Sequence, residues 1–201
     1  MALLCYGDSN TYGFDPRSFL GGRYPAQVRW TGRLAARGWQ VVEAGRNGRE
    51  IPRLPGQLEE LLRLGRDGGL LLLMLGSNDL LSAPGITAGE VAGRMETCLT
   101  ALLRLRDPAS VLLIAPPSLT PGSWVLNRSV LEQSARLSSC YAAVARRLGT
   151  GFADAGTWGV ELLFDGVHFS PAGHRAFALG LAGVLEGLPP GMPLRQKEAS
   201  P

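Results

Sequence analysis

Four short polar segments of this sequence carry the residue types of nucleophilic catalysis. In chain order they are Gly7-Asp8-Ser9-Asn10, Gly45-Arg46-Asn47-Gly48, Gly76-Ser77-Asn78-Asp79 and Asp165-Gly166-Val167-His168. Each segment alone is an ordinary turn sequence, because Gly, Asn, Asp and Ser are common turn residues. Together they supply a hydroxyl, a carboxylate, a histidine and side-chain amides, which are the groups that acyl transfer requires.

Ser9 is the candidate nucleophile, because it lies on a sharp turn that would expose its hydroxyl. His168 would accept the Ser9 proton, and Asp165, three residues earlier, could hold the imidazole in the right tautomer. The tetrahedral oxyanion needs hydrogen-bond donors aimed at one point. The backbone amides of Ser9 and Gly48 and the side-chain amide of Asn78 could supply three, and glycine at position 48 lets the backbone approach a substrate closely.

The elements before these segments predict where they meet. Five short runs predict strands, at Ala2–Tyr6, Gln40–Ala44, Leu70–Leu75, Ser110–Ala115 and Thr150–Asp154. Longer stretches of helical period separate the strands, which predicts an α/β fold with a five-stranded parallel sheet in flavodoxin-like order 2-1-3-4-5 and helices on both faces. Ligands bind beyond the carboxyl ends of such strands, and the polar segments fall there.

Apolar residues at spacings of three and four predict amphipathic helices after the third and fourth strands. One stripe comprises Val91, Met95, Cys98, Leu99, Leu102 and Leu103, and the next comprises Leu126, Val130, Leu137, Tyr141, Val144 and Leu148. The last helix has a clear start, with Ser170 as N-cap and Pro171 at the first helical position. Its predicted buried stripe is Phe177, Leu181, Val184, Leu185 and Leu188.

Length and composition restrict the classes of protein. The 201 residues point to one domain, which we place at residues 1–188, followed by a mobile tail at 189–201. A composition of 45% hydrophobic and 18% charged residues excludes a disordered or fibrous protein. The net charge is only +3 and the 19 arginines are scattered, so no nucleic-acid partner is expected. The longest aliphatic run is six residues, far short of the ~20 that cross a bilayer, so no membrane partner is expected either.

The compartment follows from the start of the chain and from its cysteines. The first apolar segment is too short for a signal peptide and lacks a basic start, which predicts a cytoplasmic protein. Cys5, Cys98 and Cys140 form no Cys-x-x-Cys pair, and any disulfide framework would leave one of them over. We expect all three to be thiols in the core.

The four polar segments, in order, resemble the first, second, third and fifth sequence blocks of the SGNH or GDSL-type hydrolases. The resemblance runs from the first strand to the last helix. It implies a three-layer α/β fold and the hydrolysis of a small-molecule ester without a metal or other cofactor. It also implies a triad of Ser9, Asp165 and His168, with Gly48 and Asn78 as donors to the oxyanion.

A narrower resemblance concerns one branch of that family. The segment Arg23–Leu34 and the Leu-Met-Leu before Gly76 are similar to the arylesterase and acyltransferase branch, which implies small acyl groups such as acetyl. Asn10 replaces the usual Leu of the first block, which we expect to alter packing beside the nucleophile but not the chemistry. The stretch Ile51–Leu62 is shorter than in that branch, where an insert helps to build the substrate channel and subunit contacts. Substrate and assembly into a homo-oligomer are therefore left open.

Aromatic residues and a proline in the later loops are candidates for a substrate pocket. Pro117 and Trp124 could line an acyl or aryl pocket, with simple packing as an equal alternative. Trp158 and Phe164 fall in loops at the same edge of the predicted sheet.

Other polar residues are interpreted as structural. His174 lies six residues after His168, the wrong spacing for two ligands on one helix face, so we expect a surface or capping residue and no metal site. Asp8 is expected to hold its loop by accepting backbone amides rather than to bind Mg²⁺. Asp79 and Asp154 are expected to be turn residues or helix caps.

These observations favour a serine esterase acting on small carboxylic esters, aryl or acetyl esters and acetylated sugars included, through an acyl-enzyme. If the pocket disfavours water, an alcohol could take the acyl group, and the protein would be an acyltransferase. One alternative is a catalytically silent ligand-binding module on the same fold, against which the complete set of Ser, His, Asp and Asn speaks. Another is a phosphate-handling protein that needs Mg²⁺, but the sequence has neither Gly-x-Gly-x-x-Gly nor a Walker lysine.

Overall fold

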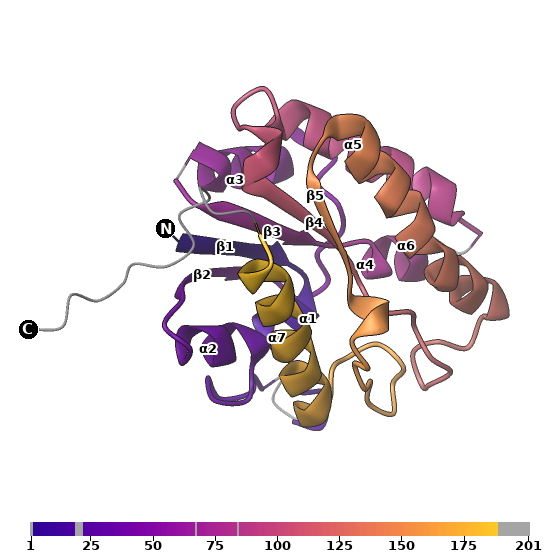
Figure 1. Ribbon diagram of the computed structural model, residues 1–201. Coiled ribbons are helices and arrows are strands. Elements are labelled where there is room, and N and C mark those ends of the chain that lie inside the picture. Colours follow the sequence, from indigo (N-terminus) through magenta and orange to yellow (C-terminus); the bar gives the residue numbers. More distant parts are fainter. Residues whose placement is uncertain (1, 19–21, 67, 84, 189–201) are drawn as a thin grey trace, which may run out of the picture.

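The computed structural model describes residues 2–18, 22–66, 68–83 and 85–188. Its centre is a five-stranded parallel sheet in the order β2-β1-β3-β4-β5 (Figure 1). The strands are β1 (Ala2–Gly7), β2 (Gln40–Gly45), β3 (Leu70–Met74), β4 (Val111–Ala115) and β5 (Gly151–Asp154). The predicted fold class and strand order are confirmed, and each strand end lies within one residue of its predicted position.

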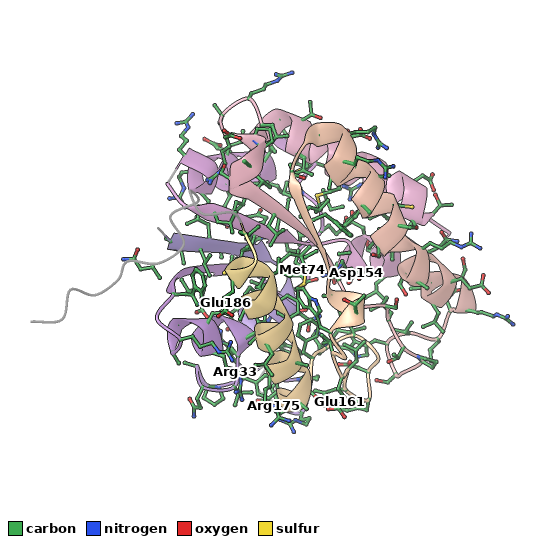
Figure 2. The ribbon with its side chains drawn as sticks, viewed as in Figure 1. Arg33, Met74, Asp154, Glu161, Arg175 and Glu186 are labelled. Atoms are coloured by element: carbon green, nitrogen blue, oxygen red, sulfur yellow. The ribbon has the colours of Figure 1, made fainter. Side chains whose placement is uncertain are left out.

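Helices cover both faces of the sheet (Figure 1). One face carries α3 (Pro55–Arg66), α4 (Ser77–Ser82), α5 (Ala88–Leu102) and α6 (Arg128–Leu148), and the other carries α2 (Trp30–Ala35) and α7 (Pro171–Glu186). Side chains of β3 alternate between the two layers: Leu71 and Leu73 pack toward the first, and Leu70, Leu72 and Met74 toward the second. Figure 2 shows the side chains that fill both layers, with Met74 near the centre. Both faces of β3 are therefore buried, as its wholly apolar sequence predicts.

The strand register brings the polar segments to one edge. Gly7 at the end of β1 pairs with Gly45 at the end of β2 and lies opposite Met74 at the end of β3. The short helix α1 (Ser9–Tyr12) follows β1, and α4 follows β3. Two 3₁₀ turns, η1 (Pro108–Ser110) and η2 (Ala155–Thr157), precede β4 and follow β5.

The helix starts are correct for α7 and wrong for α6. The Gly173 amide donates to Ser170 Oγ at 2.9 Å, with Pro171 in the first turn, which confirms the predicted cap of α7. The spacing places Leu126 on the buried stripe of α6, but Asn127 is the N-cap of α6 and Leu126 lies outside the helix, 88% exposed. The apolar spacing of α6 thus extends to a leucine that lies before the first residue of the helix.

Cys5 and Cys98 are buried and Cys140 is partly buried, so the expectation of three core thiols is met by two. All three are free. Burial raises the pKa of Cys98 to about 12, which keeps that thiol protonated and unreactive. No helix in the described part of the chain is long and apolar enough to cross a membrane. The predicted tail, residues 189–201, lies outside the described residues.

Candidate active site

The candidate nucleophile Ser9 opens a single helical turn directly after β1. Asp8 is the N-cap of this turn and accepts the Asn10 amide at 2.9 Å, which is the role predicted for it. Burial raises the pKa of Asp8 to about 6, although the Asn10 amide opposes the shift. Gly7 allows the turn to pack on β3, because a Cβ there would lie 2.8 Å from the Met74 carbonyl oxygen. Ser9 is only 5% exposed, less than expected for a loop hydroxyl.

The loop before α7 carries the candidate base and acid to the same place. Ser9 Oγ lies 3.0 Å from His168 Nε2, and His168 Nδ1 lies 2.7 Å from Asp165 Oδ2. The second carboxylate oxygen of Asp165 accepts the backbone amides of Val167 at 2.9 Å and His168 at 3.0 Å. In this arrangement the histidine can take the serine proton while the carboxylate fixes the ring.

The environment keeps the Asp165 carboxylate ionised. Burial alone would raise its pKa, but hydrogen bonds from the His168 ring and from the amides of His168 and Val167 lower the pKa below its ordinary value. An ionised carboxylate accepts a hydrogen bond from Nδ1–H, which leaves Nε2 without a proton and able to accept the Ser9 proton.

Gly48 and Asn78 border the pocket that Ser9 lines. Gly48 has a φ of +68°, a left-handed conformation that favours glycine. Asn78 belongs to α4, and its Nδ2 donates to the Arg49 carbonyl at 3.1 Å and lies 3.5 Å from an Asp8 carboxylate oxygen. The first bond orients the amide, and the second is weak enough for its N–H to turn toward a substrate oxygen.

The pocket has a volume of about 340 Å³ and is lined by Ser9, Phe14, Asn47, Gly48, Asn78, Trp124 and His168. The rings of Trp124 and Phe14 lie 5.0 and 4.8 Å from the His168 ring. Of the two predicted pocket residues, Trp124 therefore lines the pocket. Pro117 is buried outside the set of lining residues. Phe14 was missed, because no local pattern places a residue after the nucleophile turn beside a histidine over 150 positions away.

The other two aromatic candidates do not line this pocket. Trp158 packs against α7, with its ring 5.0 Å from the Phe177 ring, so its role is to hold the helix on the sheet. Phe164 remains 62% exposed, and its carbonyl accepts the Ser123 amide at 3.1 Å. That bond joins the loop of the candidate acid to the loop of Trp124.

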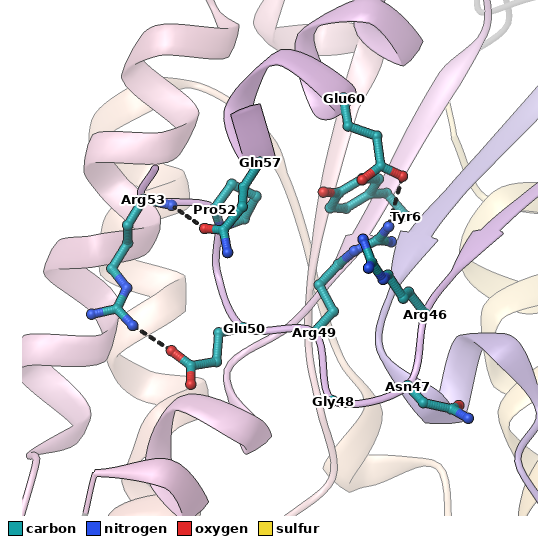
Figure 3. A pocket seen from close by; sticks show the side chains of 10 residues that line it. All are labelled: Tyr6, Arg46, Asn47, Gly48, Arg49, Glu50, Pro52, Arg53, Gln57 and Glu60. Atoms are coloured by element: carbon teal, nitrogen blue, oxygen red, sulfur yellow. Dashed lines mark hydrogen bonds and ion pairs between the residues drawn. The ribbon is translucent and has the colours of Figure 1, made fainter. Parts of the chain in front are cut away.

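A second, polar pocket of about 380 Å³ adjoins the Gly48 turn (Figure 3), lined by Tyr6, Arg46, Asn47, Gly48, Arg49, Glu50, Pro52, Arg53, Gln57 and Glu60. It shares Asn47 and Gly48 with the catalytic pocket. The Arg49 guanidinium lies 4.0 Å from the centre of the Tyr6 ring and pairs with Glu60 at 2.8 Å. Arg46 forms no hydrogen bond or ion pair through its side chain within the described part of the chain, and is available to a ligand.

His174, expected at the surface or as a cap, is fully buried in the layer of α2 and α7. Its Nδ1 accepts the Trp30 amide at 3.4 Å, and its ring meets those of Tyr24 and Phe169 edge-on. Burial, with smaller effects of nearby arginine charges, lowers the pKa of His174 to about 3. The ring is therefore neutral at all ordinary pH values.

Asp79, expected at a turn or cap, is also fully buried. It accepts the Ile51 amide at 3.0 Å and pairs with Arg94 at 2.9 Å, so it ties the segment after Gly48 to α4 and α5. Asp154 does cap η2, where it accepts the Gly156 amide at 2.9 Å. Among the described residues, no cluster of three or more His, Cys, Asp or Glu could hold a metal ion.

Comparison with known proteins identifies the family. Residues 5–176 match the model of the GDSL-like lipase/acylhydrolase family. The chain belongs to this family. The GDSL hydrolase is accordingly a carboxylic ester hydrolase, as the solved structures similar to it also indicate. A comparison with curated protein sequences finds no match.

Several of the similar solved structures are named as esterases. Est24, a carbohydrate acetylesterase from Sinorhizobium meliloti, is 27% identical with a TM-score of 0.78, over 92% of this GDSL hydrolase and 98% of that chain. The M. smegmatis aryl esterase is 27% identical with a TM-score of 0.78, and the match covers 94% of this chain and 99% of that chain. A putative arylesterase from Agrobacterium tumefaciens is 27% identical with a TM-score of 0.76, and the match covers 92% of this chain and 99% of that chain. The GDSL hydrolase thus spans nearly the whole length of each.

Proposed function

We propose that this protein is a serine esterase that cleaves small aryl and acetyl esters through an acyl-enzyme on Ser9. The observation that carries the proposal is the chain of contacts from Ser9 Oγ to His168 Nε2 at 3.0 Å and from His168 Nδ1 to Asp165 at 2.7 Å. A serine with this partner lies in a pocket bordered by two further candidate donors, Gly48 and Asn78.

The chemistry follows from these positions. Ser9 Oγ attacks the ester carbonyl carbon while its proton passes to His168 Nε2. The carbonyl oxygen becomes an oxyanion that accepts hydrogen bonds from the amides of Ser9 and Gly48 and from Asn78. The imidazolium then gives its proton to the departing alcohol oxygen as the carbon–oxygen bond breaks. Water, deprotonated by the same ring, attacks the acyl-enzyme and releases the acid.

The lining of the pocket suggests where the alcohol portion and the acyl portion of the ester bind. The departing oxygen must lie within hydrogen-bond reach of His168 Nε2, so the alcohol portion passes the rings of Phe14 and Trp124. These rings favour an aryl or other flat, apolar alcohol. The volume of about 340 Å³ suits a short acyl chain. The same lining could hold an acceptor alcohol in place of water, which is the route to acyl transfer.

The polar pocket beside Gly48 supports acetylated sugars as a second substrate class. Its lining offers guanidinium, carboxylate and amide groups to sugar hydroxyls, with Arg46 unpaired among the described side chains. The names of the similar structures, aryl esterase and carbohydrate acetylesterase, are consistent with both classes.

The test is a series of p-nitrophenyl esters from acetate to octanoate, with an acetylated sugar as a further substrate. We expect kcat/KM to be highest for acetate and to fall as the acyl chain outgrows the pocket. Ser9→Ala should reduce hydrolysis to the background rate, whereas Ser139→Ala, at an exposed serine of α6, should not change it. A serine-reactive phosphonate should label Ser9.

Three results would contradict the proposal. An active Ser9→Ala protein, or phosphonate on a different residue, would remove Ser9 as the nucleophile. Binding of esters by a wild-type protein that never hydrolyses them would favour the silent binding module. Loss of activity with a chelator, restored by Mg²⁺, would favour the phosphate-handling alternative.

A further inference from the structure

Asn10, the residue after the candidate nucleophile, holds the backbone on both sides of His168. Its Nδ2 donates to the Val167 carbonyl at 3.0 Å, and its Oδ1 accepts the Phe169 amide at 2.9 Å. Asn10 is only 5% exposed, so these hydrogen bonds are shielded from water. One side chain on the nucleophile turn thus hydrogen-bonds to the backbone immediately before and after the candidate base.

Asn10 is itself anchored from the opposite side. Its carbonyl accepts Nε1–H of Trp30 at 3.0 Å. Trp30, the first residue of α2, is 1% exposed and packs against α7, with its ring 4.8 Å from the Phe177 ring. The turn therefore cannot follow the histidine loop if that loop moves, and Asn10 sets the distance between them.

No other hydrogen bond does this work in the described structure. Between residues 7–13 and 163–170, the described side chains and backbone are joined by the two bonds of Asn10 and by the Ser9–His168 contact itself. Asp165 cannot fix the distance, because it lies on the same loop as His168 and moves with it. Without Asn10, the Ser9–His168 hydrogen bond would be the one hydrogen bond left between these two described segments.

We propose that Asn10 is a positioning residue that fixes His168 relative to Ser9 and so sets the rate of the chemical step; the proposal rests on the proposed function. A leucine at this position would have similar volume but no hydrogen-bonding group. It would leave the Val167 carbonyl and the Phe169 amide unpaired in a buried place. The role of Asn10 thus goes beyond the packing effect that the sequence suggested.

Two substitutions separate positioning from simple structural support. Asn10→Leu keeps the volume and removes both hydrogen bonds. Asn10→Asp keeps the acceptor for the Phe169 amide, loses the donor to Val167 and adds a negative charge beside His168. Ser138→Ala is the matched control, because it removes a side-chain hydrogen bond to Asp154 of 2.6 Å that lies outside the Ser9–His168 contact network. Each variant is assayed on p-nitrophenyl acetate well below its own melting temperature, with Ser9→Ala in parallel.

We expect Asn10→Leu to lower kcat about 10- to 100-fold with KM nearly unchanged, because a small misplacement of a catalytic group costs that much. Phosphonate labelling of Ser9, which needs the same proton transfer, should slow by a similar factor. Ser138→Ala should lower thermal stability but keep both rates.

A pH measurement checks that the side chain at position 10 lies beside His168. The added carboxylate of Asn10→Asp favours the charged imidazole, so the rising limb of kcat/KM should shift upward by ~0.5 to 1 pH unit. NMR titration can follow the same event without activity, since the chain has only two histidines and His174 has a pKa of about 3. The His168 ring should titrate at higher pH in Asn10→Asp than in the wild type.

The outcomes are distinguishable. Asn10→Leu with kcat and labelling within twofold of wild type would overturn the positioning role while an inactive Ser9→Ala still supports the esterase. If Asn10→Leu does not fold, kcat and the labelling rate of Asn10→Asp decide, because that variant also loses the donor to the Val167 carbonyl. An active Ser9→Ala protein would overturn both proposals.

Discussion

At the scale of single residues, Asn78 is the donor whose removal distinguishes binding from catalysis. Its amide is oriented by the Arg49 carbonyl and has only a 3.5 Å contact with Asp8 to release. Asn78→Ala should therefore lower kcat by ~10² to 10³ and change KM much less, because a preorganised donor acts mainly in the transition state. Steady-state kinetics on p-nitrophenyl acetate measure both constants. An increase in KM alone would instead make Asn78 a ground-state binding residue.

The same scale shows what a sequence can reveal about a site. Ser9 and His168 could be predicted because each follows a strand or a turn at an edge where ligands bind. The buried roles of His174 and Asp79 could not, because their partners Trp30 and Arg94 lie elsewhere in the chain and only folding brings them together. Asn10 is the same case: its type was visible, but the backbone groups that it binds lie 157 and 159 positions away.

At the scale of elements, helix caps can be tested independently of the site. Thr87 begins α5 with a capping box, in which its hydroxyl accepts the Glu90 amide at 3.2 Å and its own amide donates to the Glu90 carboxylate at 2.8 Å. Thr87→Ala removes the cap and should lower the free energy of unfolding by about 1 kcal/mol, as measured by urea denaturation. Esterase activity should stay the same.

Thr97→Ala is the control for this prediction. Thr97 is exposed in the middle of the same helix, where alanine has the higher helix propensity. Its substitution should leave stability equal or slightly raised. Equal destabilisation by both variants would mean that the cap contributes nothing beyond loss of a threonine.

Elements differed in how well their sequences predicted them. The strands were predicted to within one residue; β3 and β4 are the clearest cases, because strands buried on both faces leave short apolar runs such as Leu70–Met74. Helices α1 and α4 have four and six residues, too few to show a period of 3.6. At Leu126 the period continued into a residue outside α6, since spacing alone does not show where a helix begins.

At the scale of the whole molecule, the buried histidine couples folding to pH. His174 lies fully buried in the core layer between α2, α7 and the sheet, and burial lowers its pKa to about 3. In the unfolded chain a histidine titrates near ~6.5. Between these values the unfolded state binds a proton that the folded state does not. The contribution of neutral His174 to stability is therefore complete above pH ~6.5 and is lost progressively as the pH falls toward 3.

His174→Phe removes this titration and keeps a ring to pack against Tyr24 and Phe169. Urea unfolding of both proteins at pH 7.5 and pH 5 gives the four free energies needed. The wild type should lose about 2 kcal/mol more than the variant over this interval, because one proton taken up only by the unfolded state costs at most about 1.4 kcal/mol per pH unit. All other titratable groups are the same in both proteins, so their contributions cancel in the comparison. Equal losses of stability in the two proteins would mean that His174 is protonated in the folded protein. Because Nε2 of His174 is buried without a hydrogen-bond partner, that protonation would require the α2–α7 layer to open to water at pH 5.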